Sequence, residues 1–544
     1  MVGVRSPYAS PRGPPPTSTA STPPALGGLR RPHSANKHVY VIGTTLIAST
    51  AIYFGSGGGR TRAATGRMSN GQQIDVDGPP ILRTGQDEYD WAYRLALEEI
   101  DANVGEGDRF IAGEGWAQLW TRDTSYAAES AASLLYPAVV RSSLEASVEV
   151  DPDADEEDDS EGAPPALVWL QDSCAHFGGW PVLSDAIVGA RGAWSLYLVG
   201  GNRTFLSWAY DVTRRSLKRG ERDAFDDGLG LFRGCSSFME SNSGYPAKYH
   251  HRGDLVGMTK ALSTNALYYS GYSIAAGMAR ELGKEEEIIQ QYEARAIRLR
   301  ESIRSHLWLG EKGYYSYVMD ENNTLLSNFE GLGEALVLMD GIETDTGRIQ
   351  SIFDNVKQQR YGLPCLWPPF DLKASEHIAQ YYHNGRLWPF VQGYYAMAAA
   401  RHGRIDVFSH ALQALKDLAV KSKTFAEFYE INGTFPAQRS RQLWSETGYL
   451  AMIHQGLFGL TFEVDRLCFA PLKPKALFPS TVILENLVYQ NMVLDISIKG
   501  QGGYIKRFEL DGKKQKFSAE TPFISSKLTG RHTVKIVMGD DSKV

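Results

Sequence analysis

Five segments of the chain are rich in aromatic residues and glycines, and four of them also carry acidic side chains. They are Glu114 to Tyr126, Gly178 to Asp185, Gly228 to Pro246, Tyr382 to Phe390 and Phe425 to Tyr449. Cleavage of a glycosidic bond needs one carboxylic acid that protonates the leaving oxygen and a second carboxylate that acts as base or nucleophile. Aromatic surroundings can give a carboxyl group the raised pKa that such an acid requires. The segments therefore predict a sugar-cleaving site built from distant parts of the chain.

Three glutamates in the third and fifth segments are candidates for this chemistry. Glu240 lies in a loop of small and polar residues, where a lone carboxylate is ordinarily solvated. Glu427 and Glu430 stand within a run of aromatic residues, which can raise the pKa of a carboxyl group or hold a base. The alternative for Glu430 is an exposed turn carboxylate. Residue types alone leave each role a hypothesis.

Charged residues of the first two segments have structural as well as binding interpretations. Arg122 and Asp123 stand beside Trp116 and Trp120 just before a helix, where they could contact a sugar or form a buried ion pair. Asp185 could line a site or cap the helix that follows it, since aspartate is favoured at helix N-termini. Both interpretations stay open at this level.

Composition and charge argue against several other functions. The formal net charge of -7 comes from one run, 149–161, which carries nine acidic residues. We expect the loop 149–165 to be solvated or disordered, and no basic stripe or nucleic-acid motif accompanies it. The four cysteines lie far apart with no CxxC pair. His250 and His251 lie near Asp254 without an HExxH motif or a second ligand cluster, so we expect no metal and no cofactor.

Helical periodicity dominates the chain from about residue 85 to residue 462. The expected helices are 87–100, 122–135, 184–199, 204–219, 258–282, 285–306, 330–338, 346–358, 387–401, 407–422 and 443–460. They recur in pairs without a fixed-period repeat, which disfavours a solenoid. Loops rich in Trp, Asp, Glu, Gly and Pro favour a closed ring of six helical hairpins, with the loops gathered at one mouth.

The pattern changes after Pro471. Leu494, Ile496 and Ile498 alternate with polar residues, which is typical of a strand with one wet face. A GQGG turn follows, and further strand candidates cover 504–510 and 533–538. We therefore expect a small antiparallel β-domain at 466–544.

The N-terminal region contains one apolar run within a stretch rich in Pro, Ser, Thr, Gly and Arg, a composition that does not fold alone. Val39 to Phe54 carries no charge, and basic residues precede it, which favours a signal-anchor with the bulk of the chain in a lumen. We expect a disordered cytoplasmic tail at 1–38, a signal-anchor or signal segment at 39–58 and a linker at 59–84. Because the run is short for a spanning helix, a cleaved signal or an organelle transit segment is the alternative.

Three sequons accord with this topology. Asn202, Asn322 and Asn432 each stand two residues before a threonine, as in sites of N-glycosylation. Together with the apolar run they favour the secretory pathway, either as a type II membrane glycoprotein of the ER or Golgi lumen or as a secreted protein. A membrane partner is expected only through the single N-terminal span. The oligomeric state is left open.

The order and the sequences of the five segments resemble those of the six-hairpin glycosidase superfamily over nearly all of residues 85 to 540. The matching motifs are AGEGWAQLWTRDTSY, FGGWPVLSD, GLFRGCSSFME, HNGRLWPFVQGY and EFYEI followed by QLWSETGYL. The pattern is most similar to bacterial α-glucosidase-like or glycogen-debranching-like proteins. It is more distantly similar to the clan of trehalases, processing α-glucosidases and mannosylglycerate hydrolases.

This resemblance implies a mainly α fold, an (α/α)6 toroid at 85–465 followed by the small antiparallel β-domain. It also implies an inverting mechanism with an Asp acid and a Glu base. Glu427 falls where the family has its base. Glu240 falls where the family has its acid, with Glu in place of Asp. Glu430 and Ile431 replace the usual Asx-Pro turn, which makes Glu430 a reserve candidate for the base.

The resemblance further implies a set of residues that hold the terminal sugar. They are Trp120, Arg122, Asp123, Trp180, Asp185, His383, Asn384, Trp388 and Trp444.

We therefore expect an exo-acting, inverting glycosidase of the O-glycosyl hydrolase class that acts on an α-linked glucoside or a related oligosaccharide. A sugar phosphorylase of the same toroid is one alternative, although it would need cationic groups for phosphate in place of the base carboxylate. A noncatalytic glycan-binding protein is the other, because Glu240 departs from the expected acid. Carbohydrate is the expected partner in each case.

Overall fold

The computed structural model describes residues 67–69, 72–74, 78–153, 165–172, 178–239, 243–371, 382–517 and 521–539. The chain divides into two units, Met1–Gly58 and Gly59–Val544. The whole first unit lies outside the described residues, and with it the expected tail and signal-anchor. No helix of the described part is both long enough and apolar enough to cross a membrane.

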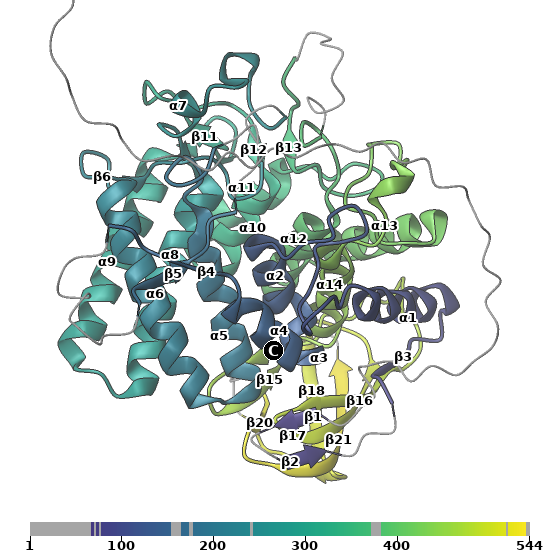
Figure 1. Ribbon diagram of the computed structural model, residues 1–544. Helices are drawn as coiled ribbons and strands as arrows, with labels where there is room; N and C mark the ends of the chain where they lie inside the picture. The colour runs from purple at the N-terminus through teal and green to yellow at the C-terminus, as the bar shows by residue number, and fades with distance from the viewer. Residues whose placement is uncertain are drawn as a thin grey trace, which may run out of the picture. The chain divides into compact units, whose positions relative to one another are not determined.

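Helices are the predominant elements of the described part of the second unit (Figure 1). The helices are α1 (Asp87–Ala102), α2 (Thr121–Ala127), α3 (Ser133–Leu135), α4 (Pro137–Glu145), α5 (Val188–Gly200), α6 (Arg203–Asp223), α7 (Gly253–Val256), α8 (Leu262–Leu282), α9 (Glu286–His306), α10 (Gly331–Met339), α11 (Thr346–Asn355), α12 (Pro389–Arg401), α13 (Ile405–Ser422) and α14 (Leu443–Ala451). Two π-helical turns, η2 (Ala128–Ala132) and η7 (Met452–Leu457), continue α2 and α14.

Six of the described helices close into an inner ring. α2 packs on α5, α5 on α8, α8 on α10, α10 on α12 and α12 on α14, and α14 packs back on α2. An outer layer covers this ring: α1 lies against α14, α4 and α6 against α5, α9 against α8, and α13 against α12. This arrangement is an (α/α)6 toroid with helices in two concentric layers, as the sequence predicted.

The two layers differ in sequence because they differ in surroundings. In the inner α12, residues Pro389 to Ala399 are all buried, and α10 and α14 are buried along their whole length. A helix that is apolar all round is expected inside a core. In the outer α9 only Ile289, Tyr292, Ala296, Leu299 and Ile303 are buried. Their spacing of three to four residues forms one apolar stripe that faces the ring.

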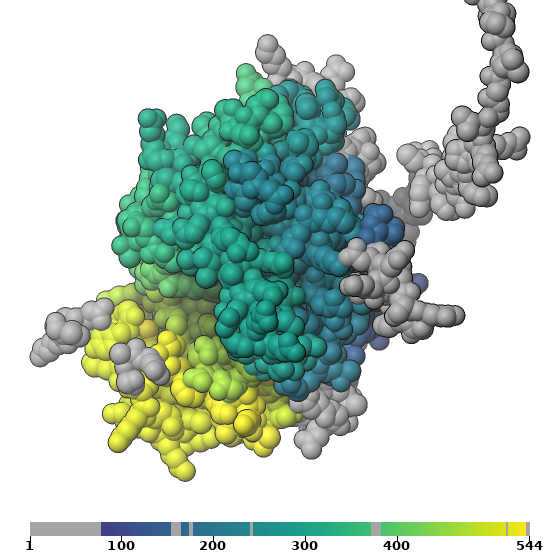
Figure 2. Space-filling model, turned by 90° about the vertical axis from the view of Figure 1, so that its left-hand side faces the viewer, coloured from purple at the N-terminus to yellow at the C-terminus, as the bar shows by residue number. Residues whose placement is uncertain are grey.

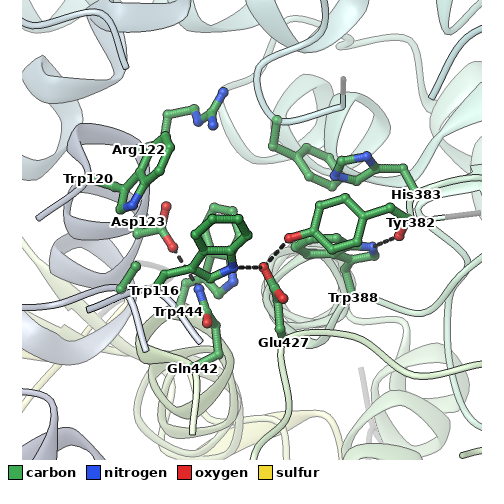
Figure 3. Close-up of a pocket in the computed structure, with 12 residues that line it drawn as sticks. Trp116, Trp120, Arg122, Asp123, Tyr382, His383, Trp388, Glu427, Gln442 and Trp444 are labelled. Atoms are coloured by element: carbon green, nitrogen blue, oxygen red, sulfur yellow. Dashed lines mark hydrogen bonds between the residues drawn. The ribbon is translucent and has the colours of Figure 1, made fainter. Parts of the chain in front are cut away.

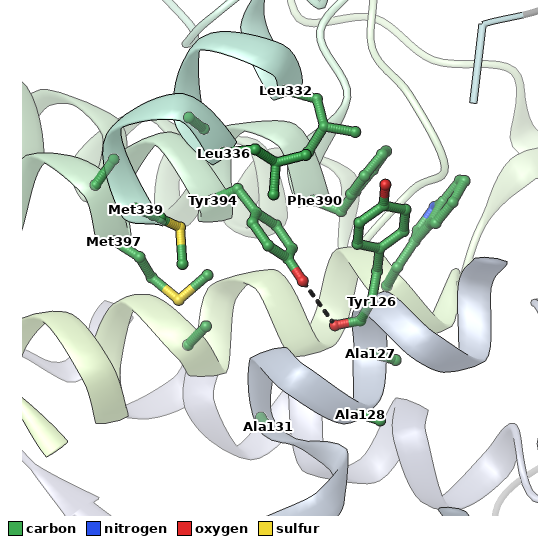
Figure 4. Close-up of a cluster of buried hydrophobic side chains, with 14 of the residues drawn as sticks. Tyr126, Ala127, Ala128, Ala131, Leu332, Leu336, Met339, Phe390, Tyr394 and Met397 are labelled. Atoms are coloured by element: carbon green, nitrogen blue, oxygen red, sulfur yellow. Dashed lines mark hydrogen bonds between the residues drawn. The ribbon is translucent and has the colours of Figure 1, made fainter. Parts of the chain in front are cut away.

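The centre of the ring is filled rather than open. Tyr126, Phe390 and Tyr394 pack there with Leu332, Leu336 and the methionines of α10 and α12 (Figure 4). The rings of Tyr126 and Tyr394 meet edge to face at 5.4 Å, and the Tyr394 hydroxyl donates to Glu129 at 2.6 Å. Aromatic pairs of this kind add to the energy of burial. This core closes the toroid beneath the site described below.

Strands after residue 460 form the C-terminal β-domain, which lies along one side of the helical body (yellow in Figures 1 and 2). A three-stranded sheet has the order β14 (Leu460–Phe462), β15 (Arg466–Phe469), β20 (Phe523–Ser525). The larger sheet has the order β19 (Lys513–Lys514), β18 (Tyr504–Leu510), β21 (Thr529–Gly539), β17 (Asn491–Gly500), β16 (Val482–Tyr489), β3 (Ile81–Arg83).

The β-domain confirms the sequence pattern and adds two features. Leu494, Ile496 and Ile498 of β17 are buried, as the alternation predicted. β17 and β21 pair in parallel, however, within a sheet whose other pairs are antiparallel. β3 comes from residues placed in the linker, and it pairs with β16. Neither feature has a local signal, because pairing between distant strands is set by burial of the shared face.

The acidic run also differs in part from expectation. Residues 154–164 lie outside the described part, but Glu149 and Asp151 are described, and both form ion pairs. Arg219 Nη1 lies 2.7 Å from Glu149 Oε1, and Arg222 Nη1 lies 3.2 Å from Asp151 Oδ2. The short hairpin of β4 (Val148–Val150) and β5 (Leu167–Trp169) thus attaches the base of the run to α6.

Candidate active site

A pocket that is partly open to solvent lies where the inner helices begin (Figure 3). It is lined by Ala112, Trp116, Trp120, Arg122, Asp123, Phe238, Tyr382, His383, Trp388, Glu427, Gln442 and Trp444. Eleven of these residues come from the first turns of α2, α12 and α14 and from the loops before them, and Phe238 lies between α6 and α7. The N-terminal end of a helix carries a partial positive charge that favours nearby anions. The position therefore suits carboxylates and the oxygen atoms of a sugar.

Glu427 is held from two sides of the pocket. Its Oε1 accepts hydrogen bonds from Trp116 Nε1 at 2.8 Å and from the Tyr382 hydroxyl (Figure 3). Its Oε2 accepts no hydrogen bond from any described residue and faces Arg439 Nη1 at 3.4 Å. Burial raises the pKa of the Glu427 carboxyl, whereas Arg439, Tyr382 and Trp116 lower it. One oxygen is thus positioned, and the other is left to accept a proton.

Asp123 is the second carboxylate in the pocket. Its Oδ1 accepts a hydrogen bond from Gln442 Nε2 at 2.8 Å. Burial raises the pKa of Asp123 to about 8, and the neighbouring Arg122 acts in the opposite direction. Glu427 also raises this pKa, because two like charges in one small pocket repel each other. A group in this state can both accept hydrogen bonds from sugar hydroxyls and, when protonated, donate one.

A distant aspartate fixes the helix that carries Asp123. The two oxygens of Asp172 accept hydrogen bonds from the backbone N–H groups of Thr121 and Arg122, at 2.9 and 3.0 Å. These N–H groups have no partner inside the helix, so an acceptor from elsewhere in the chain satisfies them. Arg122 Nη1 in turn donates to the backbone oxygen of Ser237 at 3.3 Å. The first turn of α2 is therefore joined to the segments that carry Asp172 and Ser237.

Aromatic rings form the floor and one side wall. Trp388 stacks on His383 with 4.8 Å between ring centroids, and Trp444 stacks on Phe390 at 4.1 Å. Phe238 meets both Trp388 and Trp444 edge to face. Burial and two arginines lower the pKa of His383 well below its ordinary value, so this imidazole is neutral. Flat apolar surfaces beside a few polar groups suit a sugar ring.

Glu240, the expected acid, lies outside the described residues. Its flanks are described. Ser237 Oγ donates to Asp185 Oδ2 at 3.1 Å, and Phe238 lines the pocket. On the other side, Ser243 Oγ and His383 Nδ1 are hydrogen-bonded at 2.7 Å. Residues two positions before and three positions after Glu240 are thus attached to the walls of the pocket.

Seven of the expected site residues line this pocket together: Trp120, Arg122, Asp123, His383, Trp388, Glu427 and Trp444. Three others do not line it. Trp180 donates to Asp223 at 2.7 Å and packs on Arg219. The amide of Asn384 makes two hydrogen bonds to the backbone of Phe370, and Asp185 is buried behind the pocket with Gln171 and Ser237. These three side chains hold loops rather than face the cavity.

Glu430, the reserve candidate for the base, also lies elsewhere. Its carboxylate pairs with Arg386 at 2.5 Å and is 40% exposed, and it does not line the pocket. Conversely, Trp116, Tyr382 and Gln442 were not in the expected set, although they contact the two pocket carboxylates. All three stand inside or directly beside the quoted motifs. Proximity in sequence to Trp120, His383 and Trp444 was the signal that could have found them.

Residues 182–445 match the family model of the mannosylglycerate hydrolase MGH1-like glycoside hydrolase domain. Over these residues the chain is similar to a glycoside hydrolase domain, and its toroid has the six-hairpin fold. The match includes the segments of Glu427, Trp388 and Trp444, and the toroid adds the segment of Arg122 and Asp123 on its N-terminal side. No curated protein matches the sequence.

Solved structures share the fold of this chain. A sialidase superposes with a TM-score of 0.57 and 15% identity over 75% of this chain and 37% of its own. The GH63 mannosylglycerate hydrolase from Thermus thermophilus has a TM-score of 0.51 and 14% identity, over 67% of this chain and 100% of its own. A GH78 family rhamnosidase of Bacillus sp. GL1 superposes with a TM-score of 0.52 and 12% identity, over 78% of this chain and 42% of its own. At these identities the likeness shows a common fold, and this chain spans well under half of the sialidase and rhamnosidase lengths.

Proposed function

We propose that this glycosidase removes a terminal sugar from an α-linked glucoside or a related oligosaccharide with inversion of configuration. Glu427 is the general base in this proposal, and Glu240 is the general acid. The observation that supports it most is the state of the Glu427 carboxylate, with one oxygen held by Trp116 and Tyr382 and the other without a hydrogen bond from the described residues. A base that activates water needs one such oxygen.

The shape of the pocket supports action at chain ends. Trp444, which lines the pocket, packs on Phe390 and Tyr126 of the buried core, so the pocket is closed on that side. Asp123, Arg122 and His383 then face the hydroxyls of the terminal ring, while Trp388 and Trp444 pack against its apolar face. The Thermus thermophilus mannosylglycerate hydrolase has been solved in complex with glucose, which supports a hexose-sized ligand.

The mechanism follows from inversion. A water molecule between Glu427 Oε2 and the anomeric carbon transfers a proton to Glu427 as its oxygen bonds to that carbon. Glu240 donates a proton to the departing glycosidic oxygen, so each carboxyl changes protonation once per turnover. In an inverting pair the two carboxyls stand about 6.5 to 9.5 Å apart, which leaves room for the water. Glu240 would have to meet that distance from Glu427.

A panel of disaccharides and aryl α-glycosides, each with and without added phosphate, tests the proposal. We expect phosphate-independent release of a free sugar, and NMR of the first product should show the anomer opposite to that of the substrate. Glu427→Gln should lower kcat/KM about 10³-fold or more, because it removes the base. Release of a sugar phosphate would instead identify a phosphorylase.

Glu430→Gln is the matched control. It lies three residues from Glu427 and carries the same change in charge, but its carboxylate pairs with Arg386 outside the pocket. Activity should stay within a few fold of the unmodified enzyme. Loss with Glu430→Gln together with full activity of Glu427→Gln would reverse the assignment of the base.

A further inference from the structure

Arg439 stands against the oxygen of Glu427 on which the proposed mechanism depends. Its Nη1 lies 3.4 Å from Glu427 Oε2, while Trp116 and the Tyr382 hydroxyl are both bonded to Oε1. The backbone oxygen of Arg439 also accepts a hydrogen bond from the Glu427 N–H group at 2.8 Å. Side chain and main chain of Arg439 therefore contact the same glutamate.

The guanidinium is itself held by the two residues that hold Oε1. It lies over the Trp116 ring at 4.6 Å and near the Tyr382 ring at 5.6 Å from the ring centroids. A planar guanidinium over an aromatic face is attracted by the negative charge of that face. A Cβ atom on Gly115 would lie 2.9 Å from the backbone oxygen of Gln438, so only glycine lets the two segments approach this closely. Arg439 thus belongs to one packed cluster with Trp116, Tyr382 and Glu427.

We propose that Arg439 is a positioning residue for catalysis, which keeps Glu427 ionised and directs Oε2 toward the attacking water. This inference rests on the proposed role of Glu427 as the base. Arg439 does not exchange a proton, because a guanidinium stays charged at any working pH. Its contribution is electrostatic and steric: it opposes the cost of burying a charge, and it limits rotation of the carboxylate.

Tyr382 also lowers the pKa of Glu427 through its hydrogen bond to Oε1, but none of the other charged and titratable groups described around the pocket places a positive charge beside Oε2. Among the described residues these are Asp123, Arg122, Tyr382 and His383. Asp123 raises the cost of a second negative charge, and the pKa of His383 is lowered so far that its ring is neutral. Arg122 lies beside Asp123 and acts on that carboxyl. Within the described part of the chain, Arg439 is the cation that faces the base.

The test compares Arg439→Gln, Arg439→Lys and the control Arg360→Gln. Arg360 also lies over a tyrosine ring, that of Tyr361, but it does not line this pocket. The measurement is the pH profile of kcat/KM with a glycosyl fluoride, because fluoride leaves without protonation and the profile then reports the base alone. A thermal unfolding curve for each variant confirms that it is folded.

For Arg439→Gln we expect the acidic limb of the profile to move upward by about one pH unit, because an opposite charge at this distance lowers a carboxyl pKa by that order. Activity should recover toward the unmodified level on the alkaline side of that limb. Arg439→Lys should restore most of the shift, and Arg360→Gln should leave the profile unchanged. A rise in KM alone with an unmoved limb would instead show that Arg439 contacts substrate, and it would overturn the proposal.

Glu427→Gln, measured with the same glycosyl fluoride, tests the role of Glu427 as base separately from the role of Arg439. If that variant keeps its activity, the assignment of the base fails. If it is inactive while the limb of Arg439→Gln coincides with that of the unmodified enzyme, the base assignment stands and the role of Arg439 fails.

Discussion

Gln442 Nε2 donates to Asp123 Oδ1 at 2.8 Å, and this bond joins two residues that are 319 positions apart. Gln442 directly precedes α14, and Asp123 lies in the first turn of α2, so the contact links neighbouring inner helices where the ring closes. Leu443 N donates to the Ala112 oxygen at 2.9 Å beside it. The orientation of a pocket carboxylate therefore depends on closure of the toroid.

Gly113→Ala should disturb this contact. A Cβ atom at Gly113 would lie 2.3 Å from Gln442 Oε1 and 2.6 Å from the Arg441 backbone oxygen, so the α14 side of the pocket must move. We expect a loss of about 1–3 kcal/mol in unfolding free energy, as for overpacking elsewhere, and a lower kcat. Gly200→Ala at the end of α5 meets nothing within 4 Å and should be neutral or slightly stabilising. Equal stability of the two variants in urea denaturation would contradict the steric argument.

Asp123→Ala should reduce kcat/KM by about 10²-fold or more. The change removes hydrogen bonds to the terminal sugar, each worth about 0.5–1.5 kcal/mol. It also leaves Gln442 Nε2 without its acceptor, which costs about 1–3 kcal/mol for a buried group. Asp123→Asn keeps an oxygen for Gln442 and should lose less. Steady-state kinetics on the preferred glycoside checks that kcat/KM falls further in Asp123→Ala than in Asp123→Asn. Activity of the alanine variant within threefold of the unmodified enzyme would remove Asp123 from the site.

Glu240→Gln should discriminate between leaving groups. An alkyl glycoside needs its leaving oxygen protonated, so this variant should lose about 10²- to 10⁴-fold in rate on such substrates. A glycosyl fluoride needs no acid, so its hydrolysis should fall by less than about tenfold, whereas Glu427→Gln should lose both reactions. Rate measurements on an alkyl glycoside and a glycosyl fluoride in parallel show whether Glu240 is the general acid. Unchanged activity of Glu240→Gln on alkyl glycosides would mean that another group is the acid.

Glu330→Gln should change how stability depends on pH. Glu330 is fully buried, its Oε1 is bonded to Ser236 Oγ at 2.6 Å, and burial raises its pKa to about 7. A raised carboxyl pKa contributes stability that is present below the unfolded value of about 4.3 and is lost as the pH rises through about 7. Glutamine resembles the protonated acid, so the variant should lack this loss, which is on the order of 3 kcal/mol.

Urea denaturation at pH 5 and at pH 7.5 measures the unfolding free energy at each pH. Activity at pH 5 checks that the active site of the variant is intact. The unfolding free energy of the unmodified protein should be lower at pH 7.5 than at pH 5. In Glu330→Gln this difference should be smaller, because the proton that Glu330 releases is no longer involved. A difference of the same size in both proteins would mean that Glu330 titrates near its ordinary pKa.

The outer helices were the most predictable part of the fold. The expected ranges 87–100 and 407–422 match α1 (Asp87–Ala102) and α13 (Ile405–Ser422) closely, because a helix with one wet face carries its period in its own sequence. The expected helices 122–135 and 443–460 are each interrupted by a π-helical turn. α4 was missed, and the expected start at 258 came too early, because β8 (Lys260–Ala261) precedes α8. Buried segments show no such period, so tertiary contacts decide their limits.

By itself the sequence determined the helical hairpins, the β-domain and the motifs that contain the pocket residues, because periodicity and residue type are local properties. Only the tertiary structure decided which side chains of those motifs face one another. Trp180 and Asn384 have the residue types of a sugar site, but Trp180 is bonded to Asp223 at the end of α6 and Asn384 to the backbone of Phe370. Asp123 and Glu427 share a pocket because the ring closes between α14 and α2. The energy of that closure comes from burying helices far apart in the chain, and no short stretch of sequence records it.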